Sequence, residues 1–390
     1  PLSMVPSNMY SSTSKFVLLA IPFFIFGGNI MAEGGISERL INFCRSLVGH
    51  KRSGMALVCV IVSCFFAAIS GSGPATVAAL GMIIIPAMVQ AGYDKASGTA
   101  LMSTAGAIGI IIPPSITFVI YGSITGTSVG SLFASGIVPG ILMGVLLVVA
   151  MMWVSRKREL QLLPKATWKE RWESFKDAFW GFLMPVIILG GIYGGIFTPT
   201  ESAAVGIVYA LILGFALKEL KVKDLPKILI NSLKTSTMVK FIIAAASLFS
   251  WVVSKSQIGI VISNAFISFV GGSQALYLFV LVVVLLIVGC LMDNVAATLI
   301  LAPILIPVGI ALGCNELHIG MLFCICLVVG FVTPPFGYNL FTAVSISGLN
   351  FKQIVKGALP FLLTEILLLF VFAYVPGIIT WLPRLMGYGY

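Results

Sequence analysis

Two apolar stretches of this chain are each interrupted by a pair of adjacent prolines. Residues 109–117 read GIIIPPSIT, and residues 330–338 read GFVTPPFGY. A proline inside a helix removes a backbone hydrogen bond and clashes with the preceding turn, at a cost of roughly 3 kcal/mol. It also pushes the residue before it away from helical geometry. Both stretches therefore predict broken helices.

The surroundings of these breaks are typical of a membrane protein. Hydrophobic residues make up 59% of the 390 residues and charged residues 9%, with a mean hydropathy of +1.10. Several runs approach, with their flanks, the roughly 20 apolar residues that a spanning helix needs. We expect an all-α polytopic membrane protein with roughly ten spanning helices and two re-entrant hairpins. Because the chain starts at Pro1 without a long first helix, we also expect a further span before it.

The two double prolines belong to an internal repeat. Their separation is 334 − 113 = 221 residues, and the same offset superimposes other backbone-breaking residues without a gap. Paired interrupted segments of this kind are typical of secondary transporters. The coinciding pairs are Pro86 with Pro307, Gly92 with Gly313, Gly109 with Gly330, Pro113 with Pro334, Pro114 with Pro335, Gly136 with Gly357, and Pro139 with Pro360.

Each repeat contains the same parts in the same order. An amphipathic stretch, residues 36–49 or 258–271, is expected to lie along the membrane interface. An apolar run with a polar tip follows, AAISGSGPATVAALG at 67–81 or VGCLMDNVAATLILA at 288–302. Two arms that are too short to span singly and are joined by a polar tip predict a re-entrant hairpin. The proline-broken helix comes next.

Charge indicates the orientation. The net charge of +10 comes from Lys and Arg in the loops between spans, at 39–52, 156–176, 218–234 and 352–356. Such loops stay in the cytoplasm, so we read the charge as a topology signal and predict no nucleic-acid partner. Residues 125–135 carry no charge and 254–273 hold only Lys255, which places both outside. Threading the spans between these loops predicts that the second repeat is inverted relative to the first.

A broken helix inside the membrane can bind ions through its free backbone groups. Irregular backbone is tolerated there where it is buried in protein or lines a wet cavity. Free N–H groups at the start of a half-helix suit an anion, and free carbonyls at the end of one suit a hard cation such as Na⁺. Between residues 53 and 135 the only Lys or Arg is Lys95, and between 274 and 348 there is none. An anion at the tips would depend on helix ends and co-bound cations.

Single residues carry alternative interpretations. Asp293, with Asn294, is an ionisable group inside an apolar hairpin, so it indicates either ion coupling or an N-cap. Glu201 is expected to cap a helix beside Thr200, and His318 to be structural. The hydroxyl residues at the breaks either contact a ligand or ease helix packing; they are Ser70, Ser72, Thr76, Ser115, Thr117, Thr298 and Thr333.

Five motifs in order resemble the large membrane subunit of the tripartite ATP-independent periplasmic (TRAP) transporters, the DctM-like proteins. They are GSGPATVAALG, GIIIPPSITFVIYG, GGIFTPTESAAVG, MDNVAATLILAPILIPV and GFVTPPFGYNLF. The resemblance implies an ion-transporter-type elevator fold in a bacterial inner membrane. It implies Na⁺-coupled uptake of an organic acid, such as a dicarboxylate or a sialic acid, with at least two coupling Na⁺ ions. It further implies a soluble periplasmic substrate-binding protein and a small four-helix membrane subunit as partners, and no enzymatic activity.

The resemblance also implies a division of the chain and a site. Residues 1–52 would hold a scaffold helix and an arm helix, 53–135 the first transport repeat, and 136–256 scaffold helices and basic loops. A second arm helix would occupy 257–274, the second transport repeat 275–348, and a C-terminal scaffold helix 349–390. Substrate would contact Ser72, Gly73, Pro74, Thr76, Ser115, Asn294 and Thr298. Na⁺ would be held by Ser70, Gly71, Ser72, Gly109, Ile112 and Pro113 in one site, and by Leu291, Asp293, Asn294, Gly330, Thr333 and Pro334 in the other.

Other classes of protein fit less well. A self-sufficient Na⁺/dicarboxylate or citrate carrier would share the broken-helix repeats without needing a binding protein. The FTPTES bend and the lack of Arg near the tips favour the TRAP interpretation. An intramembrane hydrolase would need paired aspartates or a Ser/His couple, and Asp293 is the one clear intramembrane carboxylate in the sequence. A channel would not need two inverted hairpins.

Overall fold

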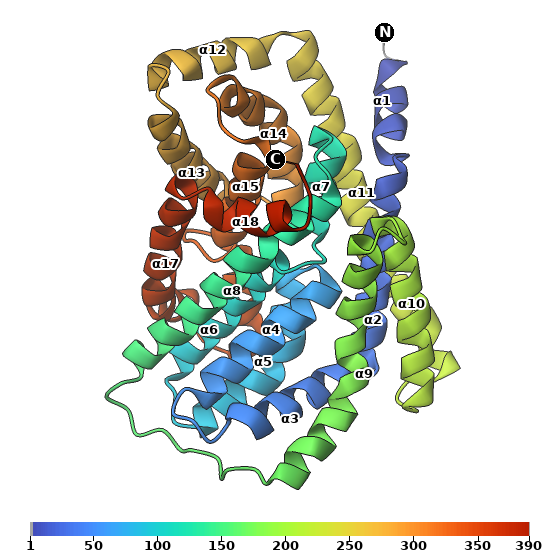
Figure 1. The fold of residues 1–390 in the computed structure, drawn as a ribbon, viewed down its shortest axis with the longest axis vertical. Coiled ribbons are helices and arrows are strands. Elements are labelled where there is room, and N and C mark those ends of the chain that lie inside the picture. Colours follow the sequence, from blue (N-terminus) through green and yellow to red (C-terminus); the bar gives the residue numbers. More distant parts are fainter. Residues whose placement is uncertain (1–2, 390) are drawn as a thin grey trace.

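The computed structural model describes residues 3–389, and within that range every regular element is a helix. The helices are α1 Met4–Thr13, η1 Phe16–Leu19, α2 Ala20–Glu33, α3 Ile36–Val48, α4 Gly54–Ser70, α5 Gly73–Gln90, α6 Lys95–Ile108, η2 Gly109–Ile111, α7 Ile116–Thr125, α8 Val129–Val154, α9 Trp168–Tyr193, α10 Pro199–Ala216, η3 Val222–Asp224, α11 Leu225–Lys255, α12 Ile258–Val270, α13 Gln274–Leu291, α14 Asn294–Ala311, α15 Glu316–Gly330, α16 Tyr338–Ser347, α17 Phe351–Tyr374 and α18 Gly377–Leu385. Figure 1 shows a helical bundle in which α1, α2, α9 and α17 run roughly along the long axis, α4, α6 and α8 are oblique, and α12 and α18 lie across it.

One group of helices forms a side bundle. Helix α2 packs against α10 and α11, α9 packs against α10, and α1 lies along α11. The bend between α9 and α10 is fixed by a capping box, in which the Glu201 carboxylate accepts from the Thr198 backbone N–H at 2.8 Å. This confirms that Glu201 caps a helix.

The two repeats enter the molecule from opposite ends. Helix α3 lies across the lower end and leads into the α4–α5 hairpin, whereas α12 lies across the upper end and leads into the α13–α14 hairpin (Figure 1). Both amphipathic stretches therefore form the expected arm helices. The inverted arrangement predicted from the charged loops is confirmed.

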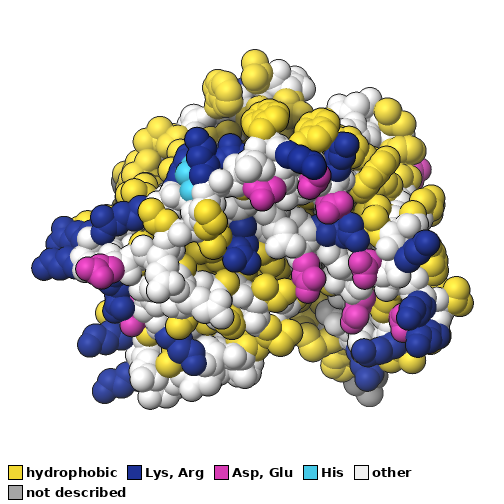
Figure 2. Space-filling model, turned by 90° about the horizontal axis from the view of Figure 1, so that it is seen from below, with side chains coloured by type: hydrophobic (Ala, Val, Ile, Leu, Met, Phe, Trp, Pro, Cys, Tyr) yellow, Lys and Arg dark blue, Asp and Glu magenta, His cyan; other side chains and the backbone are white. Residues whose placement is uncertain are grey.

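The lower end carries many of the basic side chains. Figure 2 looks onto this end and shows Lys and Arg gathered there with Asp and Glu among them. Two ion pairs tie this end together, Arg158 with Asp94 at 3.2 Å and Arg39 with Glu219 at 3.0 Å. Because Lys and Arg concentrate in cytoplasmic loops, the lower end is the cytoplasmic one.

The number of spans is close to the expectation, but the hairpin arms are longer than expected. Within the described residues, nine helices are long and apolar enough to cross a membrane, or ten if the bent α6–α7 pair is one span. Three of these are the hairpin arms α5, α13 and α14, each of 18 residues. The expectation that the arms are too short to span singly is therefore wrong for these three, whereas α4, with 17 residues, is shorter. The arms form hairpins because a tip of only two residues reverses the chain in each.

The packing of α8 and α17 bears on the division into scaffold and transport units. Helix α17 packs against α6, α8, α13, α15 and α16, and α8 packs against α4, α6, α7 and α15. We expected residues 136–256 and 349–390 to be scaffold, yet these two helices contact the hairpins and broken helices. These contacts group α8 and α17 with α4–α7 and α13–α16, while α11 and α2 also contact α14 and α4. The division of the helices into a scaffold and a transport unit therefore stays a prediction.

Candidate functional site

The first hairpin tip is a cluster of hydrogen-bonded hydroxyl groups. Helix α4 ends at Ser70, Gly71 adopts a left-handed φ of +63°, and Ser72 caps α5 by accepting from the Ala75 N–H at 3.4 Å. The Thr76 hydroxyl donates to the Ser72 carbonyl at 2.8 Å and lies 3.1 Å from the Ser70 hydroxyl. Pro74 sits in the first turn of α5, where a missing N–H costs little. The tip gathers several oxygen atoms around the polypeptide reversal.

The second hairpin tip is capped by a carboxylate. Asp293 is the N-cap of α14, and its Oδ1 accepts from the Val295 N–H at 2.8 Å. The Thr298 hydroxyl donates to the Asn294 carbonyl at 2.6 Å. Leu291 is the last residue of α13, so its carbonyl is among the four without an intrahelical partner. The capping interpretation of Asp293 is confirmed, and its role in ion coupling stays a prediction.

Each break packs closely against the hairpin of its own repeat. A Cβ built on Gly109 would lie 2.3 Å from the Ala67 Cβ, and one built on Gly330 would lie 2.4 Å from the Gly289 carbonyl carbon. Only glycine permits such approach of two backbones. Each break therefore lies against the hairpin arm just before the tip of its own repeat, with Gly109 against Ala67 of α4 and Gly330 against Gly289 of α13. The sequence repeat is matched by a repeated contact in space.

The breaks share a proline pair but differ in length, since residues 112–115 separate η2 from α7 and residues 331–337 separate α15 from α16. Helix α6 continues as η2 and then turns through extended backbone at Ile112 before α7 begins, with a bend of 41°. Both Pro113–Pro114 and Pro334–Pro335 are joined by cis peptide bonds. The Thr333 N–H donates to the Gly330 carbonyl at 3.0 Å. The predicted ligands Ile112 and Pro334 would act through backbone oxygens, because their side chains are apolar.

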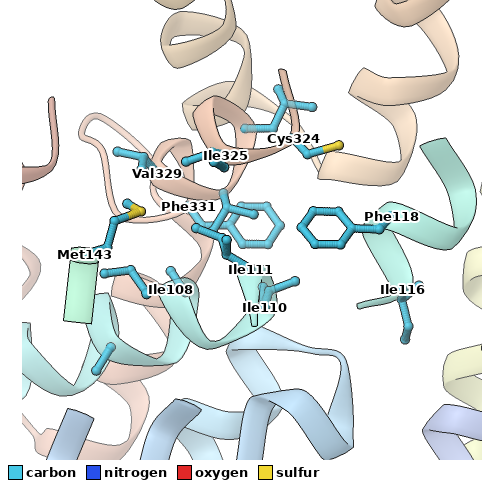
Figure 3. Packing of buried hydrophobic residues seen from close by; sticks show 14 of the residues in the cluster. Ile108, Ile110, Ile111, Ile116, Phe118, Met143, Cys324, Ile325, Val329 and Phe331 are labelled. Atoms are coloured by element: carbon cyan, nitrogen blue, oxygen red, sulfur yellow. The ribbon is translucent and has the colours of Figure 1, made fainter. Parts of the chain in front are cut away.

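The two broken helices cross near their breaks. Figure 3 shows side chains from η2 and α7, including Ile110, Ile111 and Phe118, meeting Ile325 and Phe331 of α15 and the following turn. Helix α15 contacts α6, η2 and α7. Since all these side chains are buried, the crossing is dry and fixes the two breaks relative to each other.

A residue that the sequence analysis did not single out links the repeats. Asn339, in the first turn of α16, is fully buried and donates from Nδ2 to the Ser103 carbonyl of α6 at 2.9 Å. A Cβ on Gly73 would come within 2.9 Å of its amide, so Asn339 also lies against tip 1. Its Oδ1 has no partner among the described atoms. The only signal in the sequence was a polar residue following the GFVTPPFGY motif.

Some of the buried polar atoms without a protein partner lie at the tips and breaks, and others lie elsewhere in the described part of the chain. Within the described part of the chain, the Nδ2 and Oδ1 atoms of Asn294 and the hydroxyl of Ser115 have no hydrogen-bond partner. Asn294 is 2% exposed and Ser115 is fully buried. A buried polar group without a partner is costly, so these atoms favour a ligand at this level. Both residues were predicted to bind substrate.

A cavity adjoins the second tip. It has a volume of about 280 Å³ and is lined by Asp293, Leu291 and Met292 of the tip, by α11 of the scaffold, and by Phe336, Tyr338 and Phe341 near the second break. Its walls are mostly apolar. The cavity lies between α11 and the second tip and break.

His318 is held inside the bundle. It is buried, and its Nε2 lies 2.9 Å from the Phe372 carbonyl of α17. The position confirms a structural role.

Fold and site together define a class. A multi-pass membrane protein with inverted repeats, two polar hairpin tips and two broken helices that pack against each other is a secondary-transporter-type permease. The family described as the DctM component of the tripartite ATP-independent periplasmic transporter matches residues 1–378. The chain belongs to this family and is a multi-pass protein of the bacterial inner membrane.

Individual relatives support the same family assignment. The chain is 42% identical to the C4-dicarboxylate TRAP transporter large permease protein DctM of Pseudomonas aeruginosa, over 97% of this chain and 89% of that protein. It is 34% identical to the sialic acid TRAP transporter large permease protein SiaM of Vibrio cholerae, over 100% and 91%. The crystal structure of the Alcanivorax borkumensis YdaH transporter shares the fold, with a TM-score of 0.57 at 14% identity, covering 100% of this chain and 88% of that one.

Proposed function

We propose that this chain is the translocation subunit of a Na⁺-coupled, binding-protein-dependent transporter that imports an organic acid by an elevator movement of the transport unit. The observation that carries the proposal is the pair of tip-and-break contacts, Gly109 against α4 and Gly330 against α13. These contacts hold each hairpin, with its oxygen-rich backbone reversal, against the break of its own repeat inside the bundle.

Sodium is supported by the chemistry of the donors. Hard cations are bound by oxygen ligands. Tip 1 offers the Ser70 and Thr76 hydroxyls and the Ser72 carbonyl within 2.8–3.3 Å of one another. Tip 2 offers the Asp293 carboxylate beside the end of α13. One Na⁺ at each tip would meet the predicted minimum of two coupling ions.

An organic acid is supported by the names of the relatives and by the polar groups at the tips. The relatives include a C4-dicarboxylate and a sialic acid permease, both of which bear carboxylates. Asn294 and Ser115 offer unpartnered donors, and the start of α14 offers backbone N–H groups that suit an anion.

The partners follow from the tripartite family. A small four-helix membrane subunit would pack on the apolar outer surface of the scaffold, and a soluble periplasmic protein would deliver substrate at the outer end. The test is reconstitution of the purified chain in liposomes with an inward Na⁺ gradient. We expect no uptake of succinate or N-acetylneuraminate by the chain alone, and uptake when both partners are added.

The alternative is a self-sufficient carrier. Robust, sodium-dependent uptake by the isolated chain would establish that alternative and refute dependence on a binding protein. Uptake by the complete system that is independent of Na⁺ would refute sodium coupling.

A further inference from the structure

Lys15 of the scaffold reaches across to the transport unit. It lies between α1 and η1, and its Nζ donates to the Ser123 carbonyl near the end of α7 at 2.6 Å. That carbonyl is among the last four of α7 and so has no partner within its own helix. Lys15 thus places a cationic side chain at an interface whose hairpins and broken helices supply none at their tips.

The contact sits in a small, mostly apolar chamber on the outer side of the candidate site, into which Lys15 and several Ser side chains project. The chamber has a volume of about 160 Å³ and is lined by Ser12, Lys15 and Leu18 of the scaffold's first helices, Ser247 and Ser250 of α11, Ile120 and Ser123 of α7, and Leu299 and Pro303 of α14. Pro303 has no N–H to offer the Leu299 carbonyl, and the Ser250 hydroxyl bonds that carbonyl instead at 2.8 Å. Two scaffold donors therefore hold two otherwise unpartnered carbonyls of the transport unit.

The distance from this chamber to the breaks can be measured along two helices. Ser123 is eight residues beyond Ser115 on α7, or about 12 Å at 1.5 Å per residue. Leu299 and Pro303 are five and nine residues beyond Asn294 on α14, or about 8 and 14 Å. Helix α7 runs from the first break, and α14 from the second tip, toward the outer end (Figure 1). The offset of about 12 Å on α7 falls between the two values of about 8 and 14 Å on α14.

We propose that Lys15 is a substrate-binding residue of the outward-open state, in which its ammonium group pairs with the carboxylate of the incoming organic acid. The inference rests on the proposed elevator function. A movement of the transport unit by about 12 Å toward the outer end would bring Ser115 and Asn294 level with Lys15. In the present arrangement the ammonium group instead bonds Ser123, and the substrate site lies below it.

Lys15 supplies the cationic side chain that the hairpin tips lack. A carboxylate entering from outside meets a cation on the fixed scaffold, and a charge-assisted hydrogen bond forms. When the transport unit moves inward, it leaves Lys15 behind and the ammonium group passes to the Ser123 carbonyl. The substrate is therefore held more strongly at the outer position than at the inner one, which favours release into the cytoplasm.

The first experiment measures uptake in cells that contain the complete three-component system, with succinate and N-acetylneuraminate as probes. Lys15→Gln should raise the half-saturating concentration of the transported acid by about tenfold or more, and Lys15→Arg should restore it. Lys255→Gln is the matched control, because Lys255 is an exposed scaffold lysine at the same outer end; it should behave as wild type. An unchanged half-saturation in Lys15→Gln, or no rescue by Lys15→Arg, would overturn the proposal.

The second experiment tests the geometry without transport. In a Cys-free background, a short bis-maleimide should link the Lys15→Cys, Ser123→Cys pair in the inward state. It should link Lys15→Cys with Met292→Cys, at the edge of tip 2, in the outward state. Persistent linkage to Ser123 alone would refute the predicted approach. Should wild-type cells take up neither acid, the proposed function would fail, while the linkage pattern would still decide the position of Lys15.

Discussion

Gly330→Ala would separate the second break from its hairpin. The new Cβ would lie 2.4 Å from the Gly289 carbonyl carbon and 2.5 Å from its Cα. Ordinary contact begins at 3.4 Å, so the two backbones must part by 3.4 − 2.4 = 1.0 Å. Overpacking of a well-packed interior costs about 1–3 kcal/mol. Since the neighbour is backbone and cannot rotate away, we expect a loss of about 3 kcal/mol in the free energy of unfolding.

The same displacement should weaken sodium binding, because Gly330 and the end of α13 are predicted to share one ion. Denaturant titrations in mixed micelles, in sodium chloride and in choline chloride, would measure both effects. A bound ion stabilises the folded protein by about 2.7 kcal/mol at 100 times its Kd, and the variant should lose part of this difference.

Gly190→Ala is the control, because a Cβ there meets nothing within 4 Å in the interior of α9. That variant should be neutral or slightly more stable, owing to the better helix propensity of alanine. Wild-type stability together with a wild-type sodium response in Gly330→Ala would refute the argument that the close approach of Gly330 to Gly289 shapes the site.

Three further predictions use other parts of the molecule. Asp293→Asn keeps the capping oxygen and should weaken the Na⁺ dependence of uptake while stability stays near wild type, whereas Asp293→Ala should also lose about 1 kcal/mol of stability; a wild-type sodium titration of the Asn variant would leave Asp293 as a cap alone. Single cysteines at Ser46 and Trp168, in a Cys-free background, should be labelled only from the cytoplasm and one at Ser273 only from outside; labelling of Ser46 and Ser273 from one face would contradict the inverted topology. Glu365 is 2% exposed on α17, and neither of its oxygens has a partner among the described atoms; Glu365→Met should therefore raise the free energy of unfolding by about 1 kcal/mol, and a loss of uptake in that stable variant would show that the carboxyl group is needed.

Features set by neighbouring residues were predictable from the sequence. The double prolines dictate breaks at 113 and 334 because the penalty acts within one helical turn. The SGSGP tip and the Asp293 cap are likewise local, and so is the capping box at Glu201. The arm helices were visible in the periodicity of 36–49 and 258–271, and the loop charges were enough to orient the repeats.

Features that depend on distant segments were not predictable. Asn339 acts on Ser103, 236 residues away, and Lys15 acts on Ser123, 108 residues away. The sequence shows each of these as a single polar residue in an apolar setting, and no periodicity tells which helix will lie opposite. For the same reason the packing of α8 and α17 with the hairpins emerged only from the structure.

The contacts between repeats have a historical consequence. Helix α5 of the first hairpin packs on α16 of the second repeat, and α14 of the second hairpin packs on α7 of the first. Each half therefore completes the other and lacks part of its own core when separated. A single ancestral half could have worked only as an antiparallel pair of identical subunits, inserted in both orientations in one membrane. Gene fusion would then have fixed one orientation for each half, and the basic loops could accumulate on the cytoplasmic side only after that.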